Sequence, residues 1–166
     1  IYGWFAQSSA LMADALDMLG DAAIYGFSLY VIRLHPIWQS RAGFIKGIIM
    51  GVFAISVLFG AMYRALNPVV PEATTMGIVG GMALVANLIC AVLLLEFKDT
   101  DINMRSAWLC SRNDVLANIG VLLAAGGVAW THSHWPDLIV GVALSALILK
   151  SSIEILRDAK LEMANH

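Results

Sequence analysis

Residues 76–97 read MGIVGGMALVANLICAVLLLEF, a run in which Glu96 is the one charged side chain. A membrane-spanning helix needs about 20 mostly apolar residues, so this run by itself predicts a span. The whole chain has the same character, because 60% of its 166 residues are hydrophobic and 13% are charged, against roughly 25% charged in a soluble domain. This composition excludes a water-soluble enzyme and a disordered chain. The net charge of -2 also offers no attraction to nucleic acid.

Four further apolar runs lie around this one, separated by short connectors that are polar or contain proline. We therefore predict five complete transmembrane helices, at residues 9–32, 43–66, 76–97, 106–130 and 138–156. Residues 1–7 are apolar but too short to cross a bilayer, and we expect them to be the tail of a truncated first helix. The predicted fold class is an all-α membrane bundle that forms one transmembrane domain over residues 1–166, with no cytoplasmic C-terminal domain.

The basic residues of the connectors and helix ends gather on one side of this arrangement. If the connector after the first complete helix faces the cytoplasm, Arg64 is the one external basic residue, and Arg112 lies within a span. Cytoplasmic loops are enriched in Lys and Arg. The distribution therefore predicts an integral membrane protein with a cytoplasmic C-terminus. We expect the membrane to be a bacterial inner (cell) membrane. The cytoplasmic set is Arg33, Arg41, Lys46, Lys98, Arg105, Lys150, Arg157 and Lys160.

The second complete helix carries small residues at every fourth position, Gly43, Gly47 and Gly51. Such a stripe lets a neighbouring helix backbone approach closely. The neighbour can be another helix of the same chain or the same helix of a second copy. Packing within the chain and a homodimer interface both remain open at this point.

Five ionisable residues lie inside the predicted spans. A charged side chain at the centre of a membrane helix costs about 2.5–3.5 kcal/mol even on lenient scales, so such residues indicate a functional site. Three of them follow an i, i+3, i+7 pattern on one face of the first complete helix. Another forms an i, i+4 pair with Cys110 in the fourth. The five are Asp14, Asp17, Asp21, Arg112 and Asp114.

Two facing helices can therefore present Asp17, Asp21, Cys110 and Asp114 to one point. These groups repel one another unless a divalent cation lies between them. Three carboxylates and one thiolate suit Zn²⁺, and the soft sulfur favours Cd²⁺, with Co²⁺, Fe²⁺ and Mn²⁺ as further candidates. Without a metal, crowded carboxylates take up protons. A site that holds either a metal or protons is the chemical basis of an exchanger.

Structural roles for the same residues remain as alternatives. The acids can pair with Arg112 or hydrogen-bond to amide side chains. For Asp14, this structural role and a role in the functional site are equally supported by the sequence. Cys110, like Cys90, can be a small packing residue. The candidate amide partners are Asn87, Asn118 and Asn113. Asn87 and Asn118 are also possible accessory residues of the site.

Other candidates have weaker support. His132 and His134, in the loop THSHWPD with Asp137, can be solvated or can bind metal weakly at the outer face. Paired membrane acids also occur in intramembrane aspartyl hydrolases, but the GxGD element of those enzymes is absent, since the acids here read LGD and RND. A helical subunit that only anchors partners is a third class of function.

Two stretches carry a resemblance to a known family. SSALMADALDMLGDA (8–22) is similar to the second transmembrane helix of the cation diffusion facilitators, where His or Asp is followed after three residues by Asp. NMRSAWLCSRNDVLANIGVLLAA (103–125) is similar to the fifth helix, with the same spacing after an N-x-R-x-A opening. Asn87 resembles an Asn of the fourth helix. The resemblance covers essentially the whole chain.

The resemblance implies that Asp17, Asp21 and Asp114 bind the transported metal. It implies a six-helix fold, efflux of a divalent metal from the cytoplasm by exchange with protons, alternating access around a site near the bilayer middle, and a homodimer without a prosthetic group. Cys110 stands where most zinc-transporting members have His. The first helix is nearly absent, and the cytoplasmic metal-binding domain usual in the family is missing after His166, as in some members.

The proposed ligands also differ in depth along the sequence. At 1.5 Å per residue, Asp17 lies roughly 24 Å along its helix from Arg33, whereas Cys110 lies about 7.5 Å from Arg105. For the ligands to meet, the helix of Cys110 has to begin below the membrane interface, or Arg105 has to lie well below Arg33.

Overall fold

Helices make up nearly all of the described chain. The computed structural model describes residues 2–31, 36–97 and 102–164, with side chains except at 23–31, 36–43, 46, 102–107, 109, 110 and 162. The predicted all-α bundle is confirmed. Its helices are α1 (Tyr2–Phe5), α2 (Ser9–Val31), α3 (Pro36–Leu66), α4 (Ala73–Leu95), α5 (Ile102–Thr131) and α6 (Trp135–Ala164).

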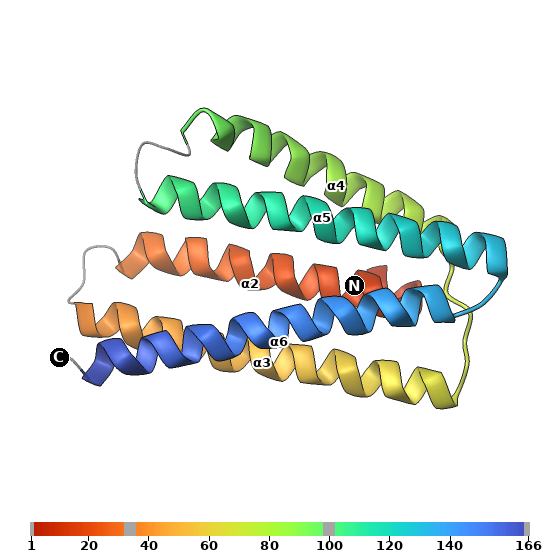
Figure 1. The fold of residues 1–166 in the computed structure, drawn as a ribbon, viewed down its shortest axis with the longest axis horizontal. Helices are drawn as coiled ribbons and strands as arrows, with labels where there is room; N and C mark the ends of the chain where they lie inside the picture. The colour runs from red at the N-terminus through yellow and green to blue at the C-terminus, as the bar shows by residue number, and fades with distance from the viewer. Residues whose placement is uncertain (1, 32–35, 98–101, 165–166) are drawn as a thin grey trace.

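Helix α2 lies in the middle of the bundle, with α4 and α5 on one side and α3 and α6 on the other (Figure 1). Two apolar cores meet on it. Ala10 and Leu11 pack in one core with residues that include Val121 of α5. Ala13 packs in the other with residues that include Met50 of α3. The first half of the helix that carries three carboxylates is therefore packed against both sides of the bundle.

Four helices are long and apolar enough to cross a membrane, judged over the described residues, and they indicate an integral membrane protein. Between 11% and 33% of the most apolar window of each segment is buried inside the bundle, as expected where lipid tails rather than water surround the rest. The segments are Gly47–Leu66, Ala73–Leu95, Ser111–Thr131 and Trp135–Leu161. Helix α2 is the remaining predicted span. It is as long as α4, at 23 residues, but it carries Asp14, Asp17 and Asp21.

Several helices extend beyond the apolar runs that predict them. α3 begins at Pro36 rather than near residue 43, and α6 continues to Ala164 rather than residue 156. With 31 and 30 residues, they are about 45 Å long, whereas the hydrocarbon core is about 30 Å thick. Their polar ends therefore lie in the headgroup region or in water, and this is why hydropathy alone starts α3 too late and ends α6 too early.

The glycine stripe packs within the chain at the two positions whose surroundings are described. A Cβ atom on Gly47 would lie 2.7 Å from Cγ of Leu156, and one on Gly51 would lie 2.8 Å from Oγ of Ser152, both on α6. Ser152 also donates a hydrogen bond of 2.7 Å to the carbonyl oxygen of Gly47. Helix α6 covers both glycines, so they are not available to a second copy. The side-chain face of Gly43 lies outside the described residues.

Candidate functional site

A chain of buried hydrogen bonds joins three helices at the level of Asp14. Asn118 of α5 donates to Oδ1 of Asp14 at 2.6 Å, and Oδ1 of Asn118 accepts from Asn87 of α4 at 3.0 Å. Ser111 donates to the backbone carbonyl oxygen of Asn87 at 3.0 Å. Asn118 is fully buried and Asp14 is 3% exposed. Because a buried polar group without a partner is costly, this network fixes α2, α4 and α5 relative to one another.

The other three intramembrane carboxylates gather beside this network. Asp114 of α5 is half-buried and interacts electrostatically with Asp21, Asp17 and Asp14 of α2. Asp14 in turn interacts with Asp17. Four acids from two helices therefore share one region inside the bundle, whereas Asn118 is the hydrogen-bond partner of Asp14. Asp14 is thus held by an amide and also lies in the electrostatic field of Asp17 and Asp114.

The helix register removes the difference in depth between the predicted ligands. α2 and α5 run antiparallel (Figure 1), and the Asp14–Asn118 hydrogen bond puts these two residues level. Asp114 precedes Asn118 by four residues on α5, so it is level with the residue four places after Asp14 on α2, which is residue 18, between Asp17 and Asp21. Cys110 precedes Asn118 by eight residues, so its backbone is level with residue 22 of α2. The four predicted ligands therefore fall within positions 17–22 of α2, about 7.5 Å along the helix axis.

A closed metal cage is absent from the part of the chain that the structure describes. Among those residues, no group of three or more His, Cys, Asp or Glu side chains is close enough to hold a metal ion. The side chain of Cys110 lies outside the described residues, so the structure does not test its place as a ligand. The set Asp17, Asp21, Cys110 and Asp114 therefore stays a prediction, supported by electrostatic proximity and register.

Arg112 points away from the acids. Its guanidinium lies over the ring of Trp108, with Cζ 5.4 Å from the ring centroid, and the two side chains line a shallow surface groove between α4 and α5. The side chain of Arg112 is exposed, whereas that of Asp14 is buried. The possible pairing of Arg112 with Asp14 is therefore replaced by the hydrogen bond from Asn118.

At the opposite end of α2, Asp137 holds the start of the helix. Oδ1 accepts from the hydroxyl of Ser8 at 2.5 Å and from the backbone N–H of Ala10 at 3.1 Å, while Oδ2 accepts from the N–H of Ser9 at 2.6 Å. A carboxylate at a helix N-terminus satisfies free N–H groups and interacts favourably with the helix dipole. The chain turns into this helix at Gln7, which has φ of 55°.

Sequence reasoning missed this contact because the bonding partners lie 127 to 129 residues apart. The local signal was present, since Ser8 precedes an apolar run, and its hydroxyl accepts the N–H of Leu11 at 3.0 Å as an N-cap does. Arg64 completes the cluster by donating to the carbonyl oxygen of Gln7 at 2.8 Å and to the hydroxyl of Ser9 at 3.0 Å.

The histidine candidates in the α5–α6 loop do not join Asp137. His132 is exposed and ends α5 with φ of 48°. His134 is half-buried against Trp135, at 5.2 Å between ring centroids, and its Nε2 is buried without a hydrogen-bond partner among the described residues. Because both carboxylate oxygens of Asp137 are bonded to the start of α2, this acid does not complete a metal site with the two histidines.

Comparison with known proteins gives a match over nearly the whole chain. The model of the cation efflux transmembrane domain matches residues 1–164. The chain belongs to the cation efflux family. The resemblance to cation diffusion facilitators is thereby confirmed, and the family that matches is one of cation efflux domains rather than of intramembrane hydrolases.

Individual relatives agree with the family assignment. The zinc transporter ZitB of Escherichia coli (strain K12) is 29% identical over 174 residues, covering 97% of this chain and 56% of the relative. The cadmium, cobalt and zinc/H(+)-K(+) antiporter of Bacillus subtilis is 26% identical over 173 residues, covering 96% and 56%. The metal cation efflux system protein CzcD of Cupriavidus metallidurans is 28% identical over 176 residues, covering 94% and 55%. The chain thus spans about half the length of these relatives.

Proposed function

We propose that this protein exports a divalent transition-metal cation, Zn²⁺ or Cd²⁺, from the cytoplasm in exchange for protons. The observation that carries the proposal is the gathering of Asp17, Asp21 and Asp114 around one membrane level, with Asp14 beside them. Like charges at this proximity are unfavourable in a membrane, so a bound cation or bound protons must offset them. The names of the relatives, a zinc transporter and a cadmium, cobalt and zinc antiporter, agree with such a cargo.

The proposed ligands are Asp17, Asp21, Cys110 and Asp114. Oxygen and sulfur donors in a four-ligand set suit Zn²⁺, and a thiolate increases the preference for Cd²⁺. Co²⁺, Fe²⁺ and Mn²⁺ are weaker candidates, since a sulfur ligand offers least to the harder ions. Asp14 acts beside the set, where Asn118 orients its carboxylate and Asn87 orients Asn118.

Exchange follows from competition between the metal and protons for the same carboxylates. Protons that enter from the acidic side neutralise Asp17, Asp21 and Asp114 and release the metal there. On the cytoplasmic side, where protons are scarcer, the carboxylates lose them and bind the next metal ion. Alternating access requires α2 to expose these groups to one side at a time, and its central place allows this without leaving the protein interior.

The same geometry supports an inner-membrane orientation with a cytoplasmic C-terminus. Figure 1 shows the C-terminal ends of α2, α4 and α6 at the same end of the bundle as the first turns of α3 and α5. The exposed Arg157 and Lys160 lie at this end, and Arg64 lies at the other. Cytoplasmic ends collect Lys and Arg. Arg33 and Lys98 lie outside the described residues.

The proposed homodimer has to use a surface other than Gly47 and Gly51, because α6 covers both. Exposed apolar side chains remain on the outer face of α3, among them Val52, Ile55 and Phe59. Close contact between two copies along that face would bury apolar side chains without disturbing the α3–α6 packing.

Bound metal in the purified protein tests the proposed function. The wild type is expected to hold about one Zn²⁺ per chain, measured by elemental mass spectrometry after removal of free metal. Asp21→Asn keeps the size of the side chain but removes a charged ligand, so its occupancy should fall at least about tenfold at the same free zinc. Asp158→Asn, at the exposed end of α6, is the control and should bind as the wild type does. Absence of zinc from the wild type would contradict the proposal. A helical subunit that only anchors partners would then be the remaining function.

The thiol of Cys110 is tested by exchanging it for the ligand usual in the family. Cys110→His should shift the ratio of bound Cd²⁺ to bound Zn²⁺ toward zinc, because imidazole is a harder ligand than thiolate. The measurement is a competition with both metals at equal concentration, and Cys90→Ser serves as the control cysteine. A ratio equal to that of the wild type would remove Cys110 from the ligand set.

A further inference from the structure

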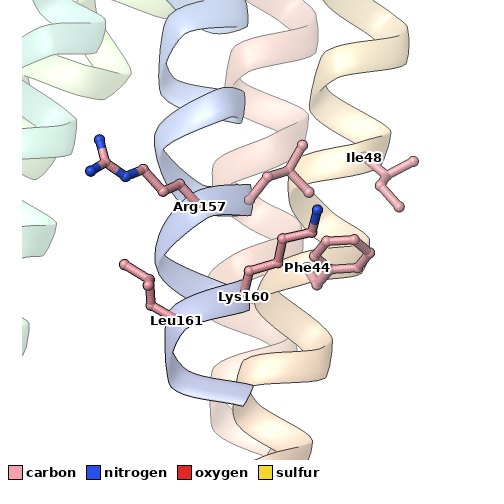
Figure 2. Close-up of a pocket in the computed structure, with 6 residues that line it drawn as sticks. Phe44, Ile48, Arg157, Lys160 and Leu161 are labelled. Atoms are coloured by element: carbon pink, nitrogen blue, oxygen red, sulfur yellow. The ribbon is translucent and has the colours of Figure 1, made fainter. Parts of the chain in front are cut away.

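A groove of about 490 Å³ lies between α3 and α6 at the end of the bundle where the chain terminates. Its apolar lining comes from both helices, and its two charged lining residues are both cations on α6. Figure 2 shows Lys160 extending toward Phe44 of α3, with Arg157 and Leu161 on the other side of the α6 ribbon. The six lining residues are Phe44, Ile48, Leu156, Arg157, Lys160 and Leu161.

The two cations have no acidic partner among the described residues. Lys150 and Glu154 form an i, i+4 pair at 3.9 Å one to two turns earlier on α6, so that lysine already faces a carboxylate. Arg157 and Lys160 are exposed, and no described carboxylate lies within ion-pair distance of either. The lining of the groove therefore carries two positive charges and no described carboxylate beside its apolar surface.

The position of the groove identifies the kind of molecule that fits it. The apolar wall continues along α3 into the segment that crosses the membrane, since Ile48 belongs to the Gly47–Leu66 span. The cations lie at the end of α6, near the end of its Trp135–Leu161 apolar segment. A ligand that matches both parts has an anionic head at the membrane surface and a hydrocarbon tail below it. Basic sites between helices on the cytoplasmic side bind anionic lipid headgroups in this way.

We propose that the groove between α3 and α6 binds an anionic phospholipid, with the headgroup phosphate held by Lys160 and attracted by the charge of Arg157, and an acyl chain lying along Phe44, Ile48 and Leu156. The bound lipid would cover the apolar side chains of the groove, next to the close contact of Gly47 with Leu156 and Ser152. It would thereby add contacts to both α3 and α6 at this end of the bundle.

The test uses phosphatidylglycerol and phosphatidylcholine added to the purified protein in detergent. Phosphatidylglycerol is expected to raise the unfolding temperature and to stay bound in native mass spectra, and phosphatidylcholine to do neither. The double variant Arg157→Gln/Lys160→Gln should bind phosphatidylglycerol roughly 30-fold more weakly, from about fivefold per basic residue. Lys150→Gln removes one charge from the same helix outside the groove and should bind phosphatidylglycerol as the wild type does.

Other occupants give different results. Glycerol phosphate, which has the headgroup charge but no acyl chain, should leave the unfolding temperature unchanged; an equal effect would reduce the site to a simple anion site and overturn the proposal. Equal binding by the double variant, or an equal loss in Lys150→Gln, would show that the groove is not the binding site. A change of oligomeric state in the double variant without lipid binding to the wild type would assign the groove to a second copy of the chain.

Discussion

Proteoliposomes that contain Asp114→Ala are expected to accumulate zinc at the background rate, at least about 100-fold more slowly than those with the wild type. Loss even of residues outside the ligand shell costs 10–100-fold in metal affinity, and loss of a ligand should cost at least the upper value. The assay sets an acidic vesicle interior against a neutral medium, so protons leave as zinc enters. Wild-type zinc uptake should stop when the pH gradient is abolished. The proposed exchange is driven by protons that leave the acidic vesicle interior as zinc enters.

Stability separates a ligand role for Asp114 from a structural one. Asp114 lies in the field of three other carboxylates, and Ala relieves that repulsion, so the unfolding temperature of the metal-free variant should not fall. Asp158→Ala, on the exposed end of α6, should leave both uptake and stability unchanged. Full zinc uptake by Asp114→Ala would remove this residue from the site. Loss of uptake together with a large fall in unfolding temperature would indicate that Asp114 serves the fold.

Asp137→Ala is expected to lower the free energy of unfolding by about 3–4 kcal/mol. The substitution removes one helix cap and leaves buried the hydroxyl of Ser8 and the N–H groups of Ser9 and Ala10 without their acceptor. For a chain of this size the unfolding temperature should fall on the order of 10 °C, measured by thermal unfolding in detergent.

Graded replacements make this prediction specific. Asp137→Asn keeps an acceptor oxygen but loses the charge, so it should fall between the wild type and Asp137→Ala. Glu72→Ala is a matched control, because Glu72 also precedes a helix but is exposed and makes no side-chain cap hydrogen bond. Its effect should stay within about 0.5 kcal/mol, as is usual for surface substitutions. A change of that small size in Asp137→Ala would show that the contact contributes little.

Most of the fold follows from local patterns in the sequence. Apolar runs of sufficient length determine the helices, since no other arrangement of a single segment satisfies its backbone groups in lipid except a closed barrel. The acids of α2 could be assigned to one face because a helix repeats every 3.6 residues. Helix ends beyond the hydrocarbon, as at Pro36 and Ala164, could not be predicted in this way, because hydropathy falls where the helix itself continues.

The candidate site was predictable in part. The sequence identified Asp14, Asp17, Asp21 and Asp114 as costly residues that need a reason, but four acids on two helices are equivalent until the partners of each are known. The hydrogen bond from Asn118 gives Asp14 a separate role and fixes the register of α5 against α2. Contacts between residues about 100 positions apart depend on how helices pack, which no local pattern encodes.

By itself the sequence determined that this chain is a membrane bundle with a carboxylate-bearing helix, because those properties follow from composition and from the period of a single helix. The tertiary structure alone decided that α2 is the central helix and that Asp137 of α6 caps its start. It also decided that Gly47 and Gly51 pack on α6 within the chain. Apolar helices have many faces that are equally compatible with lipid, so the choice among partners depends on close packing and buried hydrogen bonds between helices.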